Sequence, residues 1–141
     1  MITYLLAIAS PTHGVDKDLY YSGWASQEPY AREYREGWGE TTDGSMYTNG
    51  NIYYGVKLDI GVNRGGPLFF THFSFMGLDP RGLKDKYTTI DYYNTLRNIV
   101  RINYRYCLEN PNNRRGYGPG CWGISVCENP WGTYGAYEAI E

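Results

Sequence analysis

The residues of this sequence that could perform chemistry on a substrate include carboxylates beside a cationic partner. Glycoside hydrolysis needs two carboxyl groups, one of which must keep its proton as a general acid. Among the 15 acidic residues, Asp79 is the candidate for a catalytic carboxylate at the rim of a cleft. It follows an apolar segment and adjoins Arg81, which would keep the Asp79 carboxylate ionised. The competing interpretation is a structural turn in which Arg81 pairs with Asp79 and anchors the loop.

Aromatic rings in glycine-rich segments indicate a second chemistry, the binding of sugars. A flat ring offers an apolar face to the C–H face of a sugar, while nearby polar side chains satisfy the hydroxyls. Trp24 and Trp122 are the predicted stacking platforms, and His13, His72 and Arg81 are the predicted hydroxyl contacts. The alternatives are packing beneath a loop for each ring, and a buried hydrogen bond to a loop for His72.

Metal and cofactor sites are not predicted. The two histidines lie far apart and the three cysteines lack Cys-x-x-Cys spacing, so the zinc signal is weak. Nucleotide-binding glycine loops and the serine hydrolase elbow are absent from the sequence. Cys107 and Cys121 are separated by one loop and could form a disulfide in an oxidising compartment, or remain reduced; the residues leave both open.

Composition narrows the class of protein. The chain has 141 residues, which is the length of one domain, and 42% of them are hydrophobic. A net charge of -2 gives no basic surplus for a nucleic-acid backbone, so no nucleic-acid partner is expected. No apolar run approaches the ~20 residues of a membrane span. The 16 tyrosines and 18 glycines explain a mean hydropathy of only -0.55.

Three helices and one hairpin are predicted to position these residues. Residues 2–10 and 67–76 are apolar nearly all round, so both are expected as buried helices. Residues 90–108 repeat apolar side chains at helical spacing, with Thr88 or Thr89 as the cap.

The remaining segments are predicted as follows. Residues 47–60 alternate, which predicts a hairpin around Asn49 and Gly50. A long loop with a short helix at 29–35 is expected before it. Arg97, Arg101 and Arg105 recur every four residues and predict a solvated or ion-paired stripe on the third helix.

Four ordered blocks resemble the glycoamylase-like domain of bacterial glucoamylases, a group that includes endo-β-1,2-glucanases and is similar to a domain of cyclic β-1,2-glucan synthases. The blocks are Tyr4–His13, Gly65–Ser74, Gly77–Gly82 and Cys121–Gly123. The resemblance implies a mostly α fold, an (α/α)6-type toroid of helical hairpins whose cleft is built from loops. It implies hydrolysis of a β-linked glucan, with β-1,2-glucan as the expected substrate, and an exported enzyme in the periplasm or outside the cell.

Two departures from that family pattern concern the catalytic machinery. Relatives have an Asn-Glu-Ala stretch before the methionine of the first block, whereas this chain starts at Met1. The segment Ile124–Pro130 differs from the small, polar stretch usual after Trp-Gly. We expect residues 1–141 to be part of one domain, truncated at both ends, with the remainder of the same polypeptide as a partner and little activity alone. A non-catalytic sugar-binding module and a protein-interaction domain are the alternatives.

Overall fold

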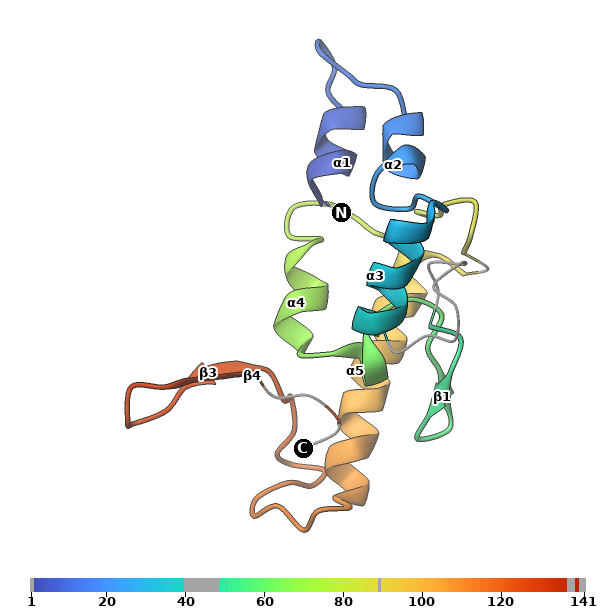
Figure 1. Ribbon diagram of the computed structural model, residues 1–141. Coiled ribbons are helices and arrows are strands. Elements are labelled where there is room, and N and C mark those ends of the chain that lie inside the picture. The colour runs from blue at the N-terminus through green and yellow to red at the C-terminus, as the bar shows by residue number, and fades with distance from the viewer. Residues whose placement is uncertain (1, 40–48, 89, 137–138, 140–141) are drawn as a thin grey trace.

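The computed structural model describes residues 2–39, 49–88, 90–136 and 139 of the chain. This part is mainly helical, with two small antiparallel hairpins (Figure 1). In chain order the elements are the helices α1 (Ile2–Ile8), α2 (Asp18–Ser22) and α3 (Pro29–Gly39), the strands β1 (Ile52–Tyr53) and β2 (Val56–Lys57), the 3₁₀ helix η1 (Asn63–Gly65), the helices α4 (Leu68–Phe73) and α5 (Tyr92–Glu109), and the strands β3 (Val126–Glu128) and β4 (Tyr134–Ala136).

The longest helix, α5, confirms the helix predicted at 90–108, but its cap is a different residue. The carboxylate of Asp91 accepts a hydrogen bond from the Asn94 amide, which satisfies a donor of the first turn. Asn110 ends the helix in the left-handed conformation, at φ 43°. The prediction of Thr88 as the cap is wrong, because Asp91 lies directly before the first helical residue; Thr89 lies outside the described residues.

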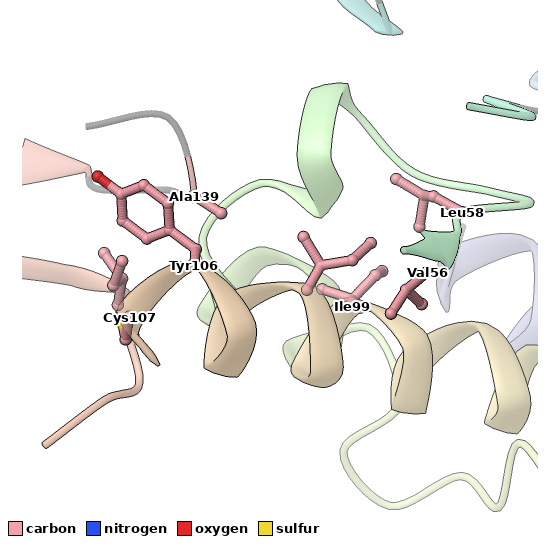
Figure 2. Close-up of a cluster of buried hydrophobic side chains, with 8 residues drawn as sticks. Val56, Leu58, Ile99, Tyr106, Cys107 and Ala139 are labelled. Atoms are coloured by element: carbon pink, nitrogen blue, oxygen red, sulfur yellow. The ribbon is translucent and has the colours of Figure 1, made fainter. Parts of the chain in front are cut away.

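The core lies along one face of α5 (Figure 2). Ile99, Ile102, Tyr106 and Cys107 recur on that face, since residues three and four apart share one side of a helix. The residues that cover them come from the first hairpin and from the C-terminal part of the chain: Val56, Leu58, Ile124 and Ala139. α5 is therefore the scaffold against which β2, η1 and α4 pack.

The first hairpin exists, but its turn differs from the prediction. β1 and β2 pair Tyr53 with Val56, so Tyr54 and Gly55 form the two-residue turn. Both have positive φ, 50° and 71°, as a type I′ turn requires. The backbone N–H of Asn49 instead donates to the backbone carbonyl of Asp59 at 2.8 Å, at the open end of the hairpin. Asn49 and Gly50 are thus not the turn, and residues 47 and 48 lie outside the described part of the chain.

The predicted burial of the helices at 2–10 and 67–76 is wrong. α1 and α4 contain no buried residue, and Leu6 is 63% exposed. α4 ends at Phe73, and Phe69, Phe70 and Phe73 are all exposed. Apolar composition all round correctly indicated helices, but no described segment covers their outer faces.

The sequence analysis did not predict α2, η1 or the β3–β4 hairpin. α2 lies beside α1 at one end of the molecule, within the expected loop, and α3 extends beyond the predicted 29–35 (Figure 1). The β3–β4 hairpin projects from the body with Trp131 near its turn, 84% exposed. None of the helices in the described part is long and apolar enough to cross a membrane.

Candidate functional site: a groove between α4 and α5

Three of the predicted site residues meet in one groove. His72 from α4 and Asp79 and Arg81 from the following turn line an open hollow of about 520 Å³. The opposite wall and the floor come from α5 and from Pro80. The α5 residues are Tyr93, Leu96, Arg97, Val100 and Arg101. The short chain between α4 and α5 brings the predicted polar groups together with the exposed side of the scaffold helix.

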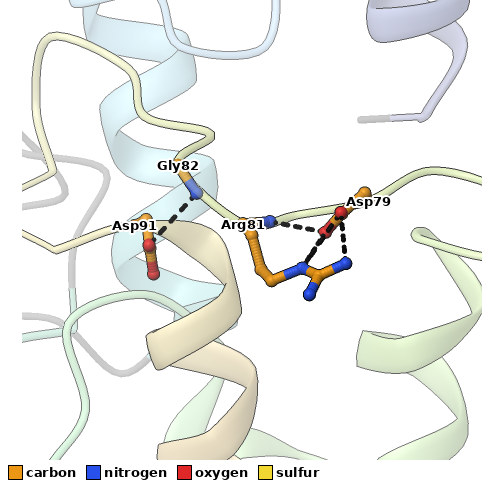
Figure 3. A network of polar contacts seen from close by, with 4 residues as sticks. All are labelled: Asp79, Arg81, Gly82 and Asp91. Carbon is orange, nitrogen blue, oxygen red and sulfur yellow. Dashed lines mark hydrogen bonds and ion pairs between the residues drawn. The ribbon is translucent and has the colours of Figure 1, made fainter.

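Asp79 and Arg81, at the rim of the groove, form an ion pair joined by several hydrogen bonds (Figure 3). Asp79 Oδ2 accepts from Arg81 Nη2 at 2.7 Å, and Oδ1 accepts from Nε at 2.9 Å and from the Arg81 amide at 3.0 Å. These side-chain hydrogen bonds, more than the backbone one, lower the pKa of Asp79 and raise that of Arg81. Asp79 therefore presents an ionised acceptor, and its pKa is shifted away from what a general acid needs.

The rim is anchored to α5 by the helix cap. Asp91 Oδ2 accepts a hydrogen bond from the Gly82 backbone amide at 3.1 Å (Figure 3). Asp91 Oδ1 accepts from the Asn94 backbone amide at 2.8 Å. The backbone donors of Asn94 and then of Gly82 lower the pKa of Asp91. One carboxylate thus starts α5 and holds the turn that carries Arg81.

His72 is held in one tautomer. Its Nδ1 lies 2.8 Å from the Leu68 carbonyl oxygen, one turn earlier in α4. A carbonyl oxygen only accepts, so Nδ1 carries a proton and donates, and this leaves Nε2 as the nitrogen that faces a ligand and accepts in the neutral form of the ring. The ring is half-buried and lines the groove. The internal hydrogen bond and the groove position thus combine features of both interpretations of His72.

The other predicted sugar contacts are not among the residues that line this groove. His13 is exposed, with its Nδ1 2.9 Å from Thr12 Oγ1. Trp24 is half-buried and meets Tyr34 edge to face, with ring centroids 6.3 Å apart. Trp122 is 45% exposed, and its ring packs edge to face on the ring of Tyr104 in α5, with the centroids 5.2 Å apart. The structure does not bring these three residues to His72 and Asp79, and their roles stay predictions.

The cysteines are free thiols in the structure. Cys107 is buried on α5, and burial is the main cause that raises its pKa, with a smaller contribution from Cys121. Cys121 itself is exposed. The disulfide between them stays a prediction. In the described ranges, no group of three histidine, cysteine or acidic side chains could hold a metal ion.

The groove residues that sequence reasoning missed are on α5. Arg97, Arg101 and Arg105 were predicted as one solvated or ion-paired stripe, and the structure places them in two different surroundings. Arg97 and Arg101 line the groove, whereas Arg105 Nη1 donates to the Tyr54 carbonyl at 2.7 Å, on the hairpin. The four-residue spacing from Tyr93 through Arg97 to Arg101 was the available signal, because such residues share one helix face.

A partly buried polar cluster holds the segment between the rim and α5. Tyr92 Oη donates to Asp85 Oδ2 at 2.6 Å, and Tyr20 Oη donates to the same oxygen at 3.2 Å. The Asp85 Oδ1 atom accepts from the Tyr87 amide at 2.8 Å. This cluster ties α2 to α5 beside the groove, and sequence reasoning missed it because Tyr20 is 65 positions from Asp85.

Comparison with solved structures shows that this helical, groove-bearing chain is similar to parts of larger proteins whose names describe glucan hydrolysis. A β-1,2-glucanase from Parabacteroides distasonis is 52% identical, with a TM-score of 0.84 over 99% of this chain and 20% of that one. An endo-β-1,2-glucanase from Chitinophaga pinensis, solved with sophorotriose and glucose, is 36% identical, with a TM-score of 0.70 over 98% of this chain and 29% of that one.

The chain belongs to the Glycoamylase family, described as "Putative glucoamylase", which matches residues 1–140. A curated relative, the exo β-1,2-glucooligosaccharide sophorohydrolase (non-reducing end) of Parabacteroides distasonis, is 53% identical over 140 residues. The match covers 99% of this chain and 19% of that protein. The chain thus spans about a fifth of the length of this relative, and the family resemblance seen in the four sequence blocks is confirmed.

Proposed function

We propose that this chain is part of a glycoside hydrolase that acts on a β-1,2-linked glucan. The observation that carries the proposal is the 53% identity with a sophorohydrolase over nearly the whole chain. The meeting of His72, Asp79 and Arg81 in one groove supports a sugar site on this chain. Residues 1–141 would then be one portion of a single domain, an (α/α)6-type toroid, in an exported protein.

In this proposal the groove binds the glucan and the general acid comes from elsewhere. His72 Nε2 and the Asp79 carboxylate offer acceptors for sugar hydroxyls, while the free N–H groups of the arginines offer donors. Leu96 and Val100 provide an apolar floor for the C–H face of a sugar ring. Asp79 would bind or orient substrate as an anion rather than protonate the leaving group.

The test compares the 141-residue chain with the whole polypeptide that its gene encodes. We expect the whole polypeptide to release reducing ends from linear β-1,2-glucan, and the chain alone to release little or none. Asp79→Asn should lower turnover in the whole polypeptide without a change in its helical circular dichroism. Full turnover by the chain alone would show that the general acid lies within residues 1–141, contrary to this proposal. No cleavage by the whole polypeptide would refute the proposal that it is a hydrolase.

A non-catalytic glucan-binding module is the second candidate, favoured by the low pKa of Asp79. Among the residues that line the groove, Asp79 is the single carboxylate. A binding module would give saturable binding of sophorotriose by the whole polypeptide with no release of reducing ends. Cleavage of the same oligosaccharide excludes this candidate.

Export is proposed on the family resemblance and on the Cys107–Cys121 pair. Separation of periplasmic and cytoplasmic fractions of the source cells, followed by detection of the polypeptide, tests it. Recovery from the cytoplasmic fraction would contradict export.

A further inference from the structure

We propose that Arg97 and Arg101 of α5 are substrate-binding residues that donate hydrogen bonds to the hydroxyl oxygens of the glucan. This inference rests on the proposed function and adds to it the opposite wall of the groove. The sequence pattern had predicted these arginines only as part of a solvated or ion-paired stripe.

The position of the two arginines is the first observation. Both line the groove that also contains His72, Asp79 and Arg81. They are one helical turn apart, and Leu96 and Val100 lie at the preceding position of each, so the apolar floor runs beside the two guanidinium groups. An apolar surface beside hydrogen-bond donors is the combination that a sugar ring with its hydroxyl groups requires.

The bonding state of the two arginines is the second observation. Within the described residues, neither guanidinium forms an ion pair with a carboxylate. Arg97 lies over the ring of Tyr93, with its Cζ 5.8 Å from the centroid. Arg101 makes a long contact of 3.4 Å from Nη1 to Asn98 Oδ1. Five N–H donors on each planar group therefore remain largely available to a ligand.

The balance of donors and acceptors is the third observation. The groove contains three guanidinium groups and one carboxylate, and that carboxylate already accepts from Arg81. Donors thus exceed acceptors, so the groove suits a ligand rich in acceptor oxygens. A charge-assisted hydrogen bond to such an oxygen contributes more to binding than one between neutral groups.

The experiment uses matched glutamine variants of the whole polypeptide, with sophorotriose as the probe. Arg97→Gln and Arg101→Gln remove the charge and the fork while keeping a polar side chain of similar length. We expect each to raise the Kd, or the KM if the probe is cleaved, by about tenfold or more, since a hydrogen bond to a charged group is worth ~1.5–3 kcal/mol. Arg97→Lys, which keeps the charge without the fork, should recover only part of the affinity.

Arg105→Gln is the control, because Arg105 is on the same helix at the same spacing but binds the Tyr54 carbonyl outside the groove. We expect its sophorotriose affinity to equal that of the wild type. Each variant is also melted by circular dichroism, so that a loss of affinity is read only from folded protein. Normal affinity in both Arg97→Gln and Arg101→Gln would overturn the inference, as would an equal loss in Arg105→Gln.

Two further outcomes separate this inference from the proposed function. If the wild-type polypeptide binds no sophorotriose, the proposed function fails, independently of any arginine variant. If inorganic phosphate displaces sophorotriose from the wild-type polypeptide and salt weakens phosphate binding, the two arginines respond to an anionic ligand instead, because salt screens the attraction between charges but not the binding of a neutral sugar. A flat salt dependence with loss of affinity in both variants supports the inference.

Discussion

Replacement of Asn103 by alanine should destabilise the chain and loosen one wall of the groove. Asn103 is 2% exposed on α5, and its side chain pairs with both backbone groups of Ile124: Nδ2 donates to the carbonyl at 3.1 Å, and Oδ1 accepts from the amide at 3.0 Å. Alanine removes two hydrogen bonds, each of which stabilises the fold by ~1 kcal/mol. It also leaves the buried backbone amide of Ile124 without its acceptor, which costs ~1–3 kcal/mol of unfolding free energy. Because these contributions overlap, we expect a loss of about 2–4 kcal/mol.

The effect should reach α4 because Ile124 and Ser125 bind the first amides of that helix. Leu68 N donates to the Ile124 carbonyl at 3.4 Å, and Phe69 N donates to Ser125 Oγ at 3.2 Å. Loss of the Asn103 contact frees the segment that holds these amides. The position of His72, three residues further along α4, then becomes less well fixed.

Urea unfolding of the chain, followed by circular dichroism, measures the change, and Asn98→Ala on the same helix is the control. Asn98 Nδ2 donates to the Lys57 carbonyl at 3.1 Å, outside the core, so its loss should cost less than ~1 kcal/mol. Unfolding of Asn103→Ala without urea would agree with the larger loss. Equal unfolding free energies for the two variants would refute the argument that pairing with Ile124 stabilises the core.

Three other perturbations have expected outcomes. Gly65→Ala should lower the melting temperature, because Gly65 has φ 95° and a Cβ there would lie 2.8 Å from a side-chain atom of α5; Gly37→Ala in α3, where nothing lies within 4 Å, should leave it equal or higher. Alkylation with iodoacetamide under native, non-reducing conditions should modify the exposed Cys121 and spare Cys107, whereas protection of both would indicate the disulfide. The folded-state pKa of Asp91 lies below its ordinary value of 3.8, so its contribution to stability is present above that pH and is lost as pH falls through the folded-state pKa. Asp91→Ala should therefore have a lower melting temperature than the wild type near pH 7. The difference between the two, measured by circular dichroism at a series of pH values, should shrink in acid.

The existence of the main helices could be predicted from the sequence, while their burial could not. The apolar spacing from Leu96 to Tyr106 predicts α5 because one helix face must be covered, and the core confirms it. For α4 the same reasoning was wrong, since a helix that is apolar all round is covered only if other segments reach it. Local composition contains no information about such segments, so Phe69 and Phe73 could not be assigned as exposed.

The turn of the first hairpin was predicted at the wrong residues. Asn49-Gly50 has the composition of a hairpin turn, yet Tyr54-Gly55 forms it, because only that register pairs Tyr53 with Val56 and buries Val56 and Leu58 against α5. The register of a strand is decided by its packing face rather than by the preferred turn residues. The second hairpin was missed since its strands, three residues each, are too short to show alternation.

The predicted site was partly recovered because some of its residues are close in sequence. Asp79 and Arg81 are joined by a local turn, and His72 is one short segment away, so proximity in the chain sufficed. The partners of this group on α5 depend on how the turn docks, and Asp91 decides that by binding Gly82 while it caps the helix. No pattern in the sequence distinguishes a carboxylate that only caps from one that also anchors a second segment.

The charge of the groove argues for a division of roles within the proposed enzyme. Asp79 is already held ionised by Arg81, and two more guanidinium groups line the same groove. Nearby cations favour the charged form of any carboxyl group, whereas a general acid must keep its proton near neutral pH. A second carboxylate placed in this groove would therefore also be driven toward its anion. We expect the general acid on an element that faces the groove from a less cationic side, and the described residues to bind and orient the glucan.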